Sequence, residues 1–72
     1  MVKYPYTVEK QAEDNYFVQF LDFPTGFTES QTALGAIDLA QDMLKGLVEA
    51  YKEDGLALPK ASPVGSLDFV EI

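Results

Sequence analysis

Residues 32–54, TALGAIDLAQDMLKGLVEAYKED, decide the fold, because this stretch is long and periodic enough to predict an amphipathic helix. Its apolar residues recur at steps of three and four and form one broad stripe, while the charged residues gather on the opposite side. The stripe comprises Leu34, Ile37, Ala40, Leu44, Leu47, Val48 and Tyr51, with Ala36 and Met43 at its margins. Such a face cannot stay in water, so the rest of the chain is expected to supply a surface that covers it.

The two ends of this helix carry recognisable signals. Thr32 is suited to the N-cap, and Gly55 is suited to the position just after the helix, with Pro59 preventing its resumption. Gly35 and Gly46 lie inside the helix, where each costs roughly 1 kcal/mol relative to alanine. They indicate either a close approach of another backbone or plain tolerance, and the sequence leaves both readings open.

Two stretches before the helix alternate between apolar and polar residues and predict strands. In residues 2–9 the apolar positions are Val2, Tyr4, Tyr6 and Val8, and residues 10–15 are expected to form a polar hairpin loop. Pro5 has no amide proton, so we expect either an edge position or an amide that faces away from a ladder. In residues 16–23, the side chains of Phe17 and Leu21 fall on the face opposite the core. We therefore predict that these two residues contact another subunit.

Shorter segments complete the predicted fold. Residues 27–30 are expected to form a third strand, and residues 67–72 include a final short one. The predicted order is β-β-β-α-β, an α+β class in which one helix packs on an antiparallel sheet in two layers. With 72 residues, we expect a single domain covering residues 1–72, without a C-terminal DNA-binding domain.

The composition limits the possible partners. Twelve acidic and five basic residues give a net charge of −7, and all the basic residues are scattered lysines. Binding to nucleic acid needs clustered positive charge, so none is expected from this chain. A basic protein partner fits better, although acidity that merely keeps the protein soluble is an equally good reading of the charge. No signal peptide or membrane span is evident, which predicts a cytoplasmic protein without membrane contact.

The inventory of catalytic groups is poor. The chain has neither cysteine nor histidine, which excludes thiol and histidine-based catalysis and the commonest metal ligands. The carboxylates of Asp22, Asp38 and Asp42 are the remaining candidates for a metal-dependent nuclease. The helix pair should face away from the sheet that carries Asp22, so these groups are not expected to converge. We predict no enzyme activity, no catalytic residues, no metal site and no cofactor.

Residues 20–32, FLDFPTGFTESQT, resemble the signature of the HicB antitoxin family, which runs roughly Phe-Pro-Asp-Leu-Pro-Gly-Cys-Phe-Thr-Gln-Gly-Asp-Thr. The agreeing positions are Phe20, Asp22, Pro24, Phe27, Thr28 and Thr32. Leu21 replaces a proline, Thr25-Gly26 replaces Gly-Cys, and Ser30-Gln31 replaces Gly-Asp. The resemblance extends over nearly the whole chain, including the alternation of small and large apolar residues in the helix.

The resemblance implies a partial ribonuclease-H-like fold without a working nuclease site. It also implies an antitoxin that masks a small basic HicA-like toxin, an mRNA-cleaving ribonuclease, and that assembles as a homodimer or homotetramer. Near the signature, Asp22, Phe23, Phe27 and Glu29 are predicted to contact this toxin, because acidic and aromatic groups suit a basic partner. The alternatives are an orphan oligomerisation or ligand-sensing module without a toxin and, from the fold kinship alone, a nuclease.

Overall fold

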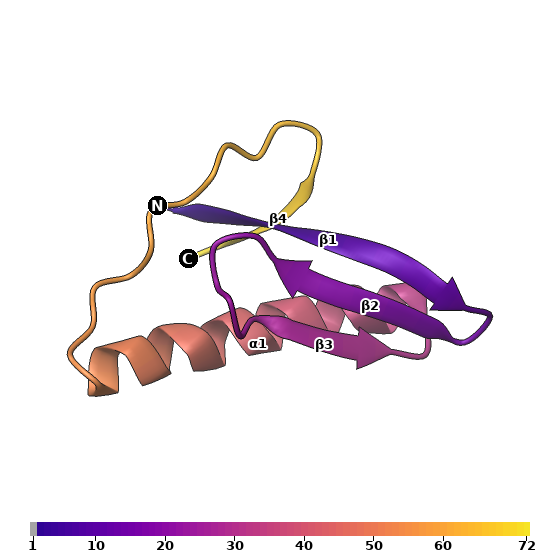
Figure 1. Cartoon of the computed structure of the whole chain (residues 1–72), viewed down its shortest axis with the longest axis horizontal. Helices are drawn as coiled ribbons and strands as arrows, with labels where there is room; N and C mark the ends of the chain where they lie inside the picture. The colour runs from indigo at the N-terminus through magenta and orange to yellow at the C-terminus, as the bar shows by residue number, and fades with distance from the viewer. Residues whose placement is uncertain (1) are drawn as a thin grey trace.

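The computed structural model describes residues 2–72 as an antiparallel sheet of four strands with one helix packed along it (Figure 1). The elements are β1 (Lys3–Ala12), β2 (Asn15–Phe20), β3 (Phe27–Ser30), α1 (Ala33–Glu53) and β4 (Asp68–Glu71). The strands lie in the order β3-β2-β1-β4, so β3 and β4 are the edges. The predicted α+β class and element order are confirmed.

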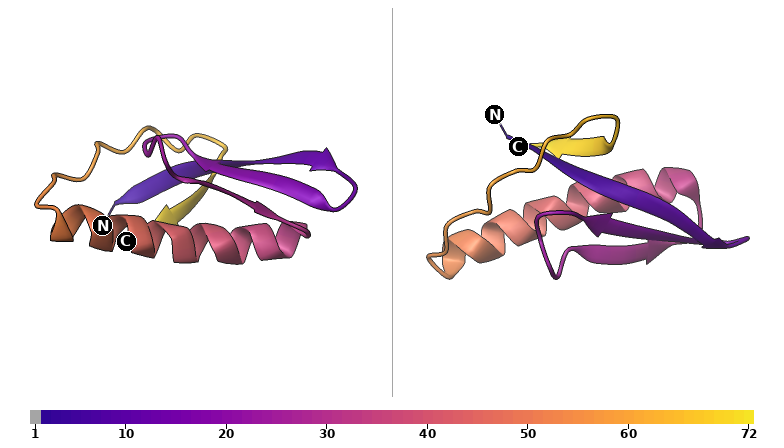
Figure 2. Two further views of the ribbon diagram at one scale, coloured as in Figure 1. Left: turned by 60° about the horizontal axis from the view of Figure 1, so that its bottom comes forward. Right: turned by 45° about the horizontal axis from the view of Figure 1, so that its top comes forward.

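The helix covers one face of the sheet and leaves the other open (Figure 2). After α1, the chain returns over residues 54–67 and adds β4 beside β1. The two ends of the described chain meet there, because Val2 and Ile72 exchange both backbone hydrogen bonds, at 3.2 and 2.9 Å. Within residues 2–72, no helix combines the length and apolar character required to cross a membrane.

The core lies between α1 and the inner face of the sheet. Its buried residues are Tyr4, Tyr6, Val18, Phe20, Phe23, Ala36, Ala40 and Leu44. The alternation predicted for the first two strands therefore identifies correctly the side of the sheet that faces the core, with Tyr4, Tyr6, Val18 and Phe20 on it. Val2 is an exception: it is 40% exposed and lies before β1, outside the core.

The helix ends as predicted, but its buried stripe is narrower. Thr32 Oγ1 accepts a hydrogen bond from the Gly35 N–H at 2.9 Å, and Gly55 has a φ of +69°, typical of a residue that ends a helix. Ala36, predicted at the margin, is completely buried, whereas Leu34 and Ile37 are 78% and 41% exposed. The sheet covers only part of the apolar face, and the side that carries Leu34 and Ile37 is left open.

Two predicted strand boundaries were wrong. β1 continues to Ala12 through an irregularity between Lys10 and Ala12, so the hairpin loop is much shorter than residues 10–15. β2 ends at Phe20 instead of residue 23, and the Phe20 N–H bonds to the Gly26 carbonyl at 2.8 Å, across the turn that leads into β3. A second bond, from the Gly26 N–H to the Phe23 carbonyl at 2.9 Å, closes the turn in between.

The edge position considered for Pro5 is also wrong, because β1 lies inside the sheet. Val2 and Ile72 form a hydrogen-bonded pair, and such pairs alternate along an antiparallel ladder. The pair Pro5–Phe69 therefore exchanges no hydrogen bonds, and the Pro5 carbonyl accepts instead from the Leu21 N–H at 3.3 Å. A proline is tolerated here because its nitrogen faces β2 at the point where β2 ends.

Candidate partner-binding surface

The face of the sheet that points away from α1, called the outer face below, carries an aromatic residue between two carboxylates. In the strand register, Phe17 of β2 lies opposite Glu9 of β1 on one side and Glu29 of β3 on the other. Residues directly opposite one another in neighbouring strands share a face of the sheet. Val18, the next residue along β2, is fully buried beneath α1, so this row of three side chains points outward.

A second aromatic ring extends the row. Phe27 of β3 stacks on Phe17, with ring centroids 6.0 Å apart and an angle of 28° between the planes. Phe27 is 55% exposed, an unusual position for so large an apolar side chain. The stack therefore places an aromatic surface at the outer face, next to the two glutamates.

A polar hollow adjoins Glu29 at the end of β3. It has a volume of about 380 Å³ and is lined by Asp14, Asn15, Glu29, Ser30 and Gln31. The side-chain oxygen of Asn15 is buried and has no hydrogen-bond partner among residues 2–72. With two carboxylates and this free acceptor, the hollow suits a hydrogen-bond donor or a cation better than an anion.

The structure brings together residues that were predicted to serve two different purposes. Phe27 and Glu29 were predicted to contact a toxin, and Phe17 and Leu21 to contact another subunit. Phe17, Phe27 and Glu29 lie together on the outer face. Leu21 follows β2, is 48% exposed, and continues the alternation that points Phe17 outward. Phe17, Phe27 and Glu29 therefore share one surface, and Leu21 is exposed just beyond the end of β2.

Two other predicted contact residues lie elsewhere. Phe23 is 1% exposed and packs edge-on against Tyr4 and Tyr51, with centroid distances of 5.0 and 5.5 Å. Asp22 accepts hydrogen bonds from both the backbone N–H, at 2.9 Å, and the hydroxyl of Ser62. Phe23 is thus not accessible to a partner, and Asp22 ties the loop after β2 to the segment before β4.

Glu9 is the member of the outer face that sequence reasoning missed. The signal was present, because alternation along the first strand points residue 9 away from the core. The hairpin loop was predicted to span residues 10–15, however, which leaves the register of the two strands undefined. Since β1 runs to Ala12 and the pairing resumes at Asn15, Glu9 lies opposite Phe17.

The remaining carboxylates do not gather around a common point. Asp38 and Asp42 lie on exposed positions of α1, whereas Asp22 is held by Ser62 on the loop after β2. Among residues 2–72, no three acidic side chains are placed to hold a metal ion together. The outer face offers aromatic rings and carboxylate acceptors.

Sequence comparison gives an independent view. The chain is 38% identical over 71 residues to Antitoxin HicB 1 of Photorhabdus laumondii, an alignment that covers 99% of this chain and 45% of the relative. It is 35% identical over 72 residues to Antitoxin HicB of Escherichia coli K12, covering 99% of this chain and 52% of the relative. A protein of the same name from Escherichia coli O157:H7 matches equally well. No protein-family model matches the chain.

These alignments agree with the resemblance carried by residues 20–32. The chain spans about half the length of the curated relatives that it matches. The shared half contains all the elements described above, because the alignments cover 99% of the chain. Over nearly its whole length, the chain is therefore similar in sequence to about half of each of these HicB antitoxins.

Proposed function

We propose that this chain is an antitoxin domain that neutralises a small basic HicA-like ribonuclease by covering the toxin's RNA-binding surface with its outer face. The arrangement of Glu9, Phe17, Phe27 and Glu29 carries this proposal. The antitoxin names of the relatives support the same role.

The charge of the chain suits such a partner. A protein that binds RNA presents lysines and arginines to the phosphates. An acidic antitoxin, with a net charge of −7, attracts this surface and competes with RNA for it. Glu9 and Glu29, on either side of Phe17, provide two such contacts at the outer face.

The aromatic stack adds affinity that charge alone does not. The aliphatic stem and guanidinium of an arginine pack on an aromatic ring while the guanidinium bonds to a neighbouring carboxylate. Phe27, 55% exposed and in contact with Phe17, offers the ring, and Glu29 the carboxylate. Aromatic residues at such positions are typical anchors of protein interfaces. Asp22 and Phe23 support this surface indirectly, by holding the loop that leads into β3.

The proposal is tested by co-purifying the chain with the product of the adjacent small basic gene and measuring binding and RNA cleavage. The wild-type chain should bind this protein and suppress cleavage. Phe27→Ala should weaken binding about tenfold or more, because an anchoring ring is lost. Glu29→Lys should weaken it similarly, through lost attraction and new repulsion.

Glu49→Lys is the matched control, because it changes the net charge by the same amount at an exposed position of α1. It should leave binding nearly unchanged. Equal weakening by Glu29→Lys and Glu49→Lys would mean that net charge alone governs association. A chain that neither binds the basic protein nor reduces its activity would instead favour an orphan oligomerisation or sensing module, the alternative reading.

A further inference from the structure

Residues 57–72, called the strap below, add no fully buried side chain to the domain. Every buried residue of the core lies between Tyr4 and Leu44. From the strap, Ala61 and Val70 pack against this core, and both are only partly buried. The core is therefore built by the chain that precedes the strap.

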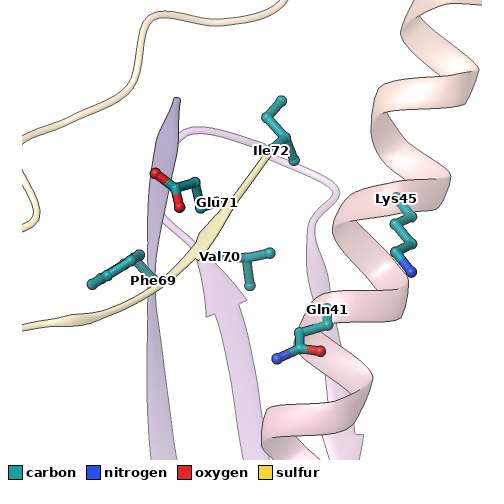
Figure 3. Close-up of a pocket in the computed structure, with 6 residues that line it drawn as sticks. All are labelled: Gln41, Lys45, Phe69, Val70, Glu71 and Ile72. Carbon is teal, nitrogen blue, oxygen red and sulfur yellow. The ribbon is translucent and has the colours of Figure 1, made fainter. Parts of the chain in front are cut away.

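The end of the strap, β4, packs loosely on α1. A groove with a volume of about 400 Å³ lies between them, and its lining is formed by Gln41, Lys45, Phe69, Val70, Glu71 and Ile72. Figure 3 shows Val70 on the side of β4 nearer to α1, with Phe69 and Glu71 on the other side. The Phe69 ring is 44% exposed and lies beneath the ammonium group of Lys3, 5.0 Å from its centroid. Apolar packing therefore contributes little to holding β4 against the helix.

Hydrogen bonds hold the strap in place. The Tyr4 hydroxyl donates to the Pro59 carbonyl at 2.6 Å. The Asp22 carboxylate accepts from the Ser62 N–H at 2.9 Å and from the Ser62 hydroxyl. Further along the strap, β4 pairs with β1. The strap is thus attached by polar contacts that are distinct from the packing of the core.

The backbone of β1 faces the strap at every second residue. Val2 and Ile72 exchange hydrogen bonds, and bonded pairs alternate with non-bonded ones along an antiparallel ladder. Tyr4 and Tyr6 therefore also direct their N–H and C=O groups to β4, while the residues between them face β2. The amide proton that Pro5 lacks belongs to the β2 side. The edge of β1 that the strap covers is consequently complete, and such an edge is a template for another strand.

The inner side chains of β1 have packing partners outside the strap. The Tyr4 ring lies edge-on against Phe23, with centroids 5.0 Å apart, and the Tyr6 ring packs against Phe20 at 5.4 Å. Phe20 belongs to β2, and Phe23 belongs to the loop that follows it. Segments with few buried apolar contacts open at a lower free energy than the core. Detaching the strap should therefore cost less than unfolding the domain.

We propose that the strap opens from β1 as one unit while β1, β2, β3 and α1 stay folded, and that the Asp22–Ser62 and Tyr4–Pro59 contacts are the catches that keep it closed. In the closed state, β4 occupies the edge of β1. In the open state, the backbone groups that faced β4 are free to pair with another strand. The strap thus controls access to this edge, and its opening does not depend on the proposed function.

Amide hydrogen exchange, measured residue by residue by NMR where it reports the opening equilibrium, tests the proposal. Tyr6 and Thr7 are adjacent, but the Tyr6 N–H faces the strap and the Thr7 N–H faces β2. After correction for intrinsic rates, the Tyr6 amide should exchange at least about tenfold faster, because opening of the strap releases it, whereas Thr7 requires unfolding of the domain. The amides of Ser62 and Val70 should give the same free energy of opening as Tyr6.

Two variants separate opening of the strap from unfolding of the domain. Ser62→Ala removes the hydroxyl of one catch, so exchange of the Tyr6 amide should become about tenfold faster although Tyr6 is far from residue 62 in the sequence. Gly46→Ala is the control, because α1 is helical in both states and a Cβ atom there would meet no atom of the described residues within 4 Å. It should slow exchange of Thr7 about two- to fivefold and leave Tyr6 unchanged.

Equal protection of Tyr6 and Thr7 would overturn the proposal, because the strap would then open only when the domain unfolds. Different free energies of opening for Ser62, Tyr6 and Val70 would also contradict it, since they indicate fraying residue by residue. A Gly46→Ala variant that slows Tyr6 as much as Thr7 would lead to the same conclusion. If Ser62→Ala leaves the Tyr6 amide unchanged, Ser62 is not a catch.

Discussion

The carboxylate of Asp22 accepts a hydrogen bond from the Ser62 backbone N–H at 2.9 Å and a second one from the Ser62 hydroxyl, across 40 residues of sequence. This contact joins the loop after β2 to the segment that delivers β4. Beside it, the Tyr4 hydroxyl donates to the Pro59 carbonyl at 2.6 Å and secures the same segment. The position of β4 therefore depends on a few polar contacts as well as on its pairing with β1.

Asp22→Ala should lower the free energy of unfolding by about 1–3 kcal/mol, because it removes the acceptor of two partly buried hydrogen bonds. Urea denaturation monitored by circular dichroism measures this change. Glu13→Ala is the control: its side chain is 99% exposed and its only ion pair, to Lys10, is 4.0 Å long within the described residues, so the change should be below about 0.5 kcal/mol. Equal effects would show that the Asp22 contact adds nothing to stability.

Phe23→Ala should destabilise the domain by about 3–5 kcal/mol, because it removes a ring that is buried among Tyr4, Phe20 and Tyr51. Phe27→Ala should cost less than about 1 kcal/mol, since its ring is 55% exposed. The pair separates folding from recognition: Phe23 is expected to affect stability and Phe27 to affect toxin binding. Thermal unfolding of both variants, together with the binding assay, tests the distinction.

The two helical glycines should respond to alanine in opposite ways. A Cβ atom on Gly46 would meet no atom of the described residues within 4 Å, so Gly46→Ala should stabilise the domain by about 0.5–1 kcal/mol. A Cβ atom on Gly35 would lie 2.6 Å from Ser30 Oγ and 2.9 Å from Thr32 Oγ1, the hydroxyl that caps α1. Gly35→Ala should therefore be destabilising despite its better helix propensity. Urea midpoints of the two variants give the comparison, and a stabilising Gly35→Ala would contradict it.

Stability should fall in alkaline solution. Burial raises the pKa of Tyr4 above its ordinary value of 10.0, and Asp22 and Tyr51 raise it further. Burial, and then Asp68, raise the pKa of Tyr6 in the same direction. The unfolded chain releases these protons at lower pH than the folded one, so the stabilisation is complete below about pH 10 and is lost as the pH rises further.

Urea midpoints measured between about pH 8 and about pH 11 test this dependence. The slope above about pH 10 should be smaller in the double variant Tyr4→Phe/Tyr6→Phe, which has no phenol to ionise at either position. The slope is compared instead of the absolute stability of the double variant, because Tyr4→Phe also loses the hydrogen bond to Pro59 and lowers the stability at every pH. An unchanged slope would assign the alkaline loss to other groups.

Much of the fold could be predicted because it depends on local patterns. The steps of three and four in α1, the cap at Thr32 and the end at Gly55 follow from interactions within a few residues of sequence. Strand alternation identified Tyr4, Tyr6, Val18 and Phe20 as inward-facing in the same way. The third strand, at Phe27–Ser30, was predicted with its exact bounds.

The candidate site was less predictable, because it depends on register. Whether Glu9 lies beside Phe17 depends on the length of the hairpin loop, and whether Phe27 stacks on Phe17 depends on where β2 ends. The alternation of residues 16–23 places Phe23 on the same face as Phe17 and Leu21, away from the core. The turn closed by the Gly26 N–H instead points its side chain into the core. A one-residue difference in such a turn reverses every side chain that follows.

The sequence by itself determined that one amphipathic helix packs on an antiparallel sheet in an acidic chain, because hydrophobic periodicity follows from residue order and net charge follows from composition. Only the tertiary structure decided which apolar residues are covered. Ala36 is buried while Leu34 is exposed, and Pro5 lies inside the sheet, because coverage depends on how many strands lie over the helix and on which side the sheet ends. That end, at β4, is a consequence of long-range pairing that no local pattern encodes.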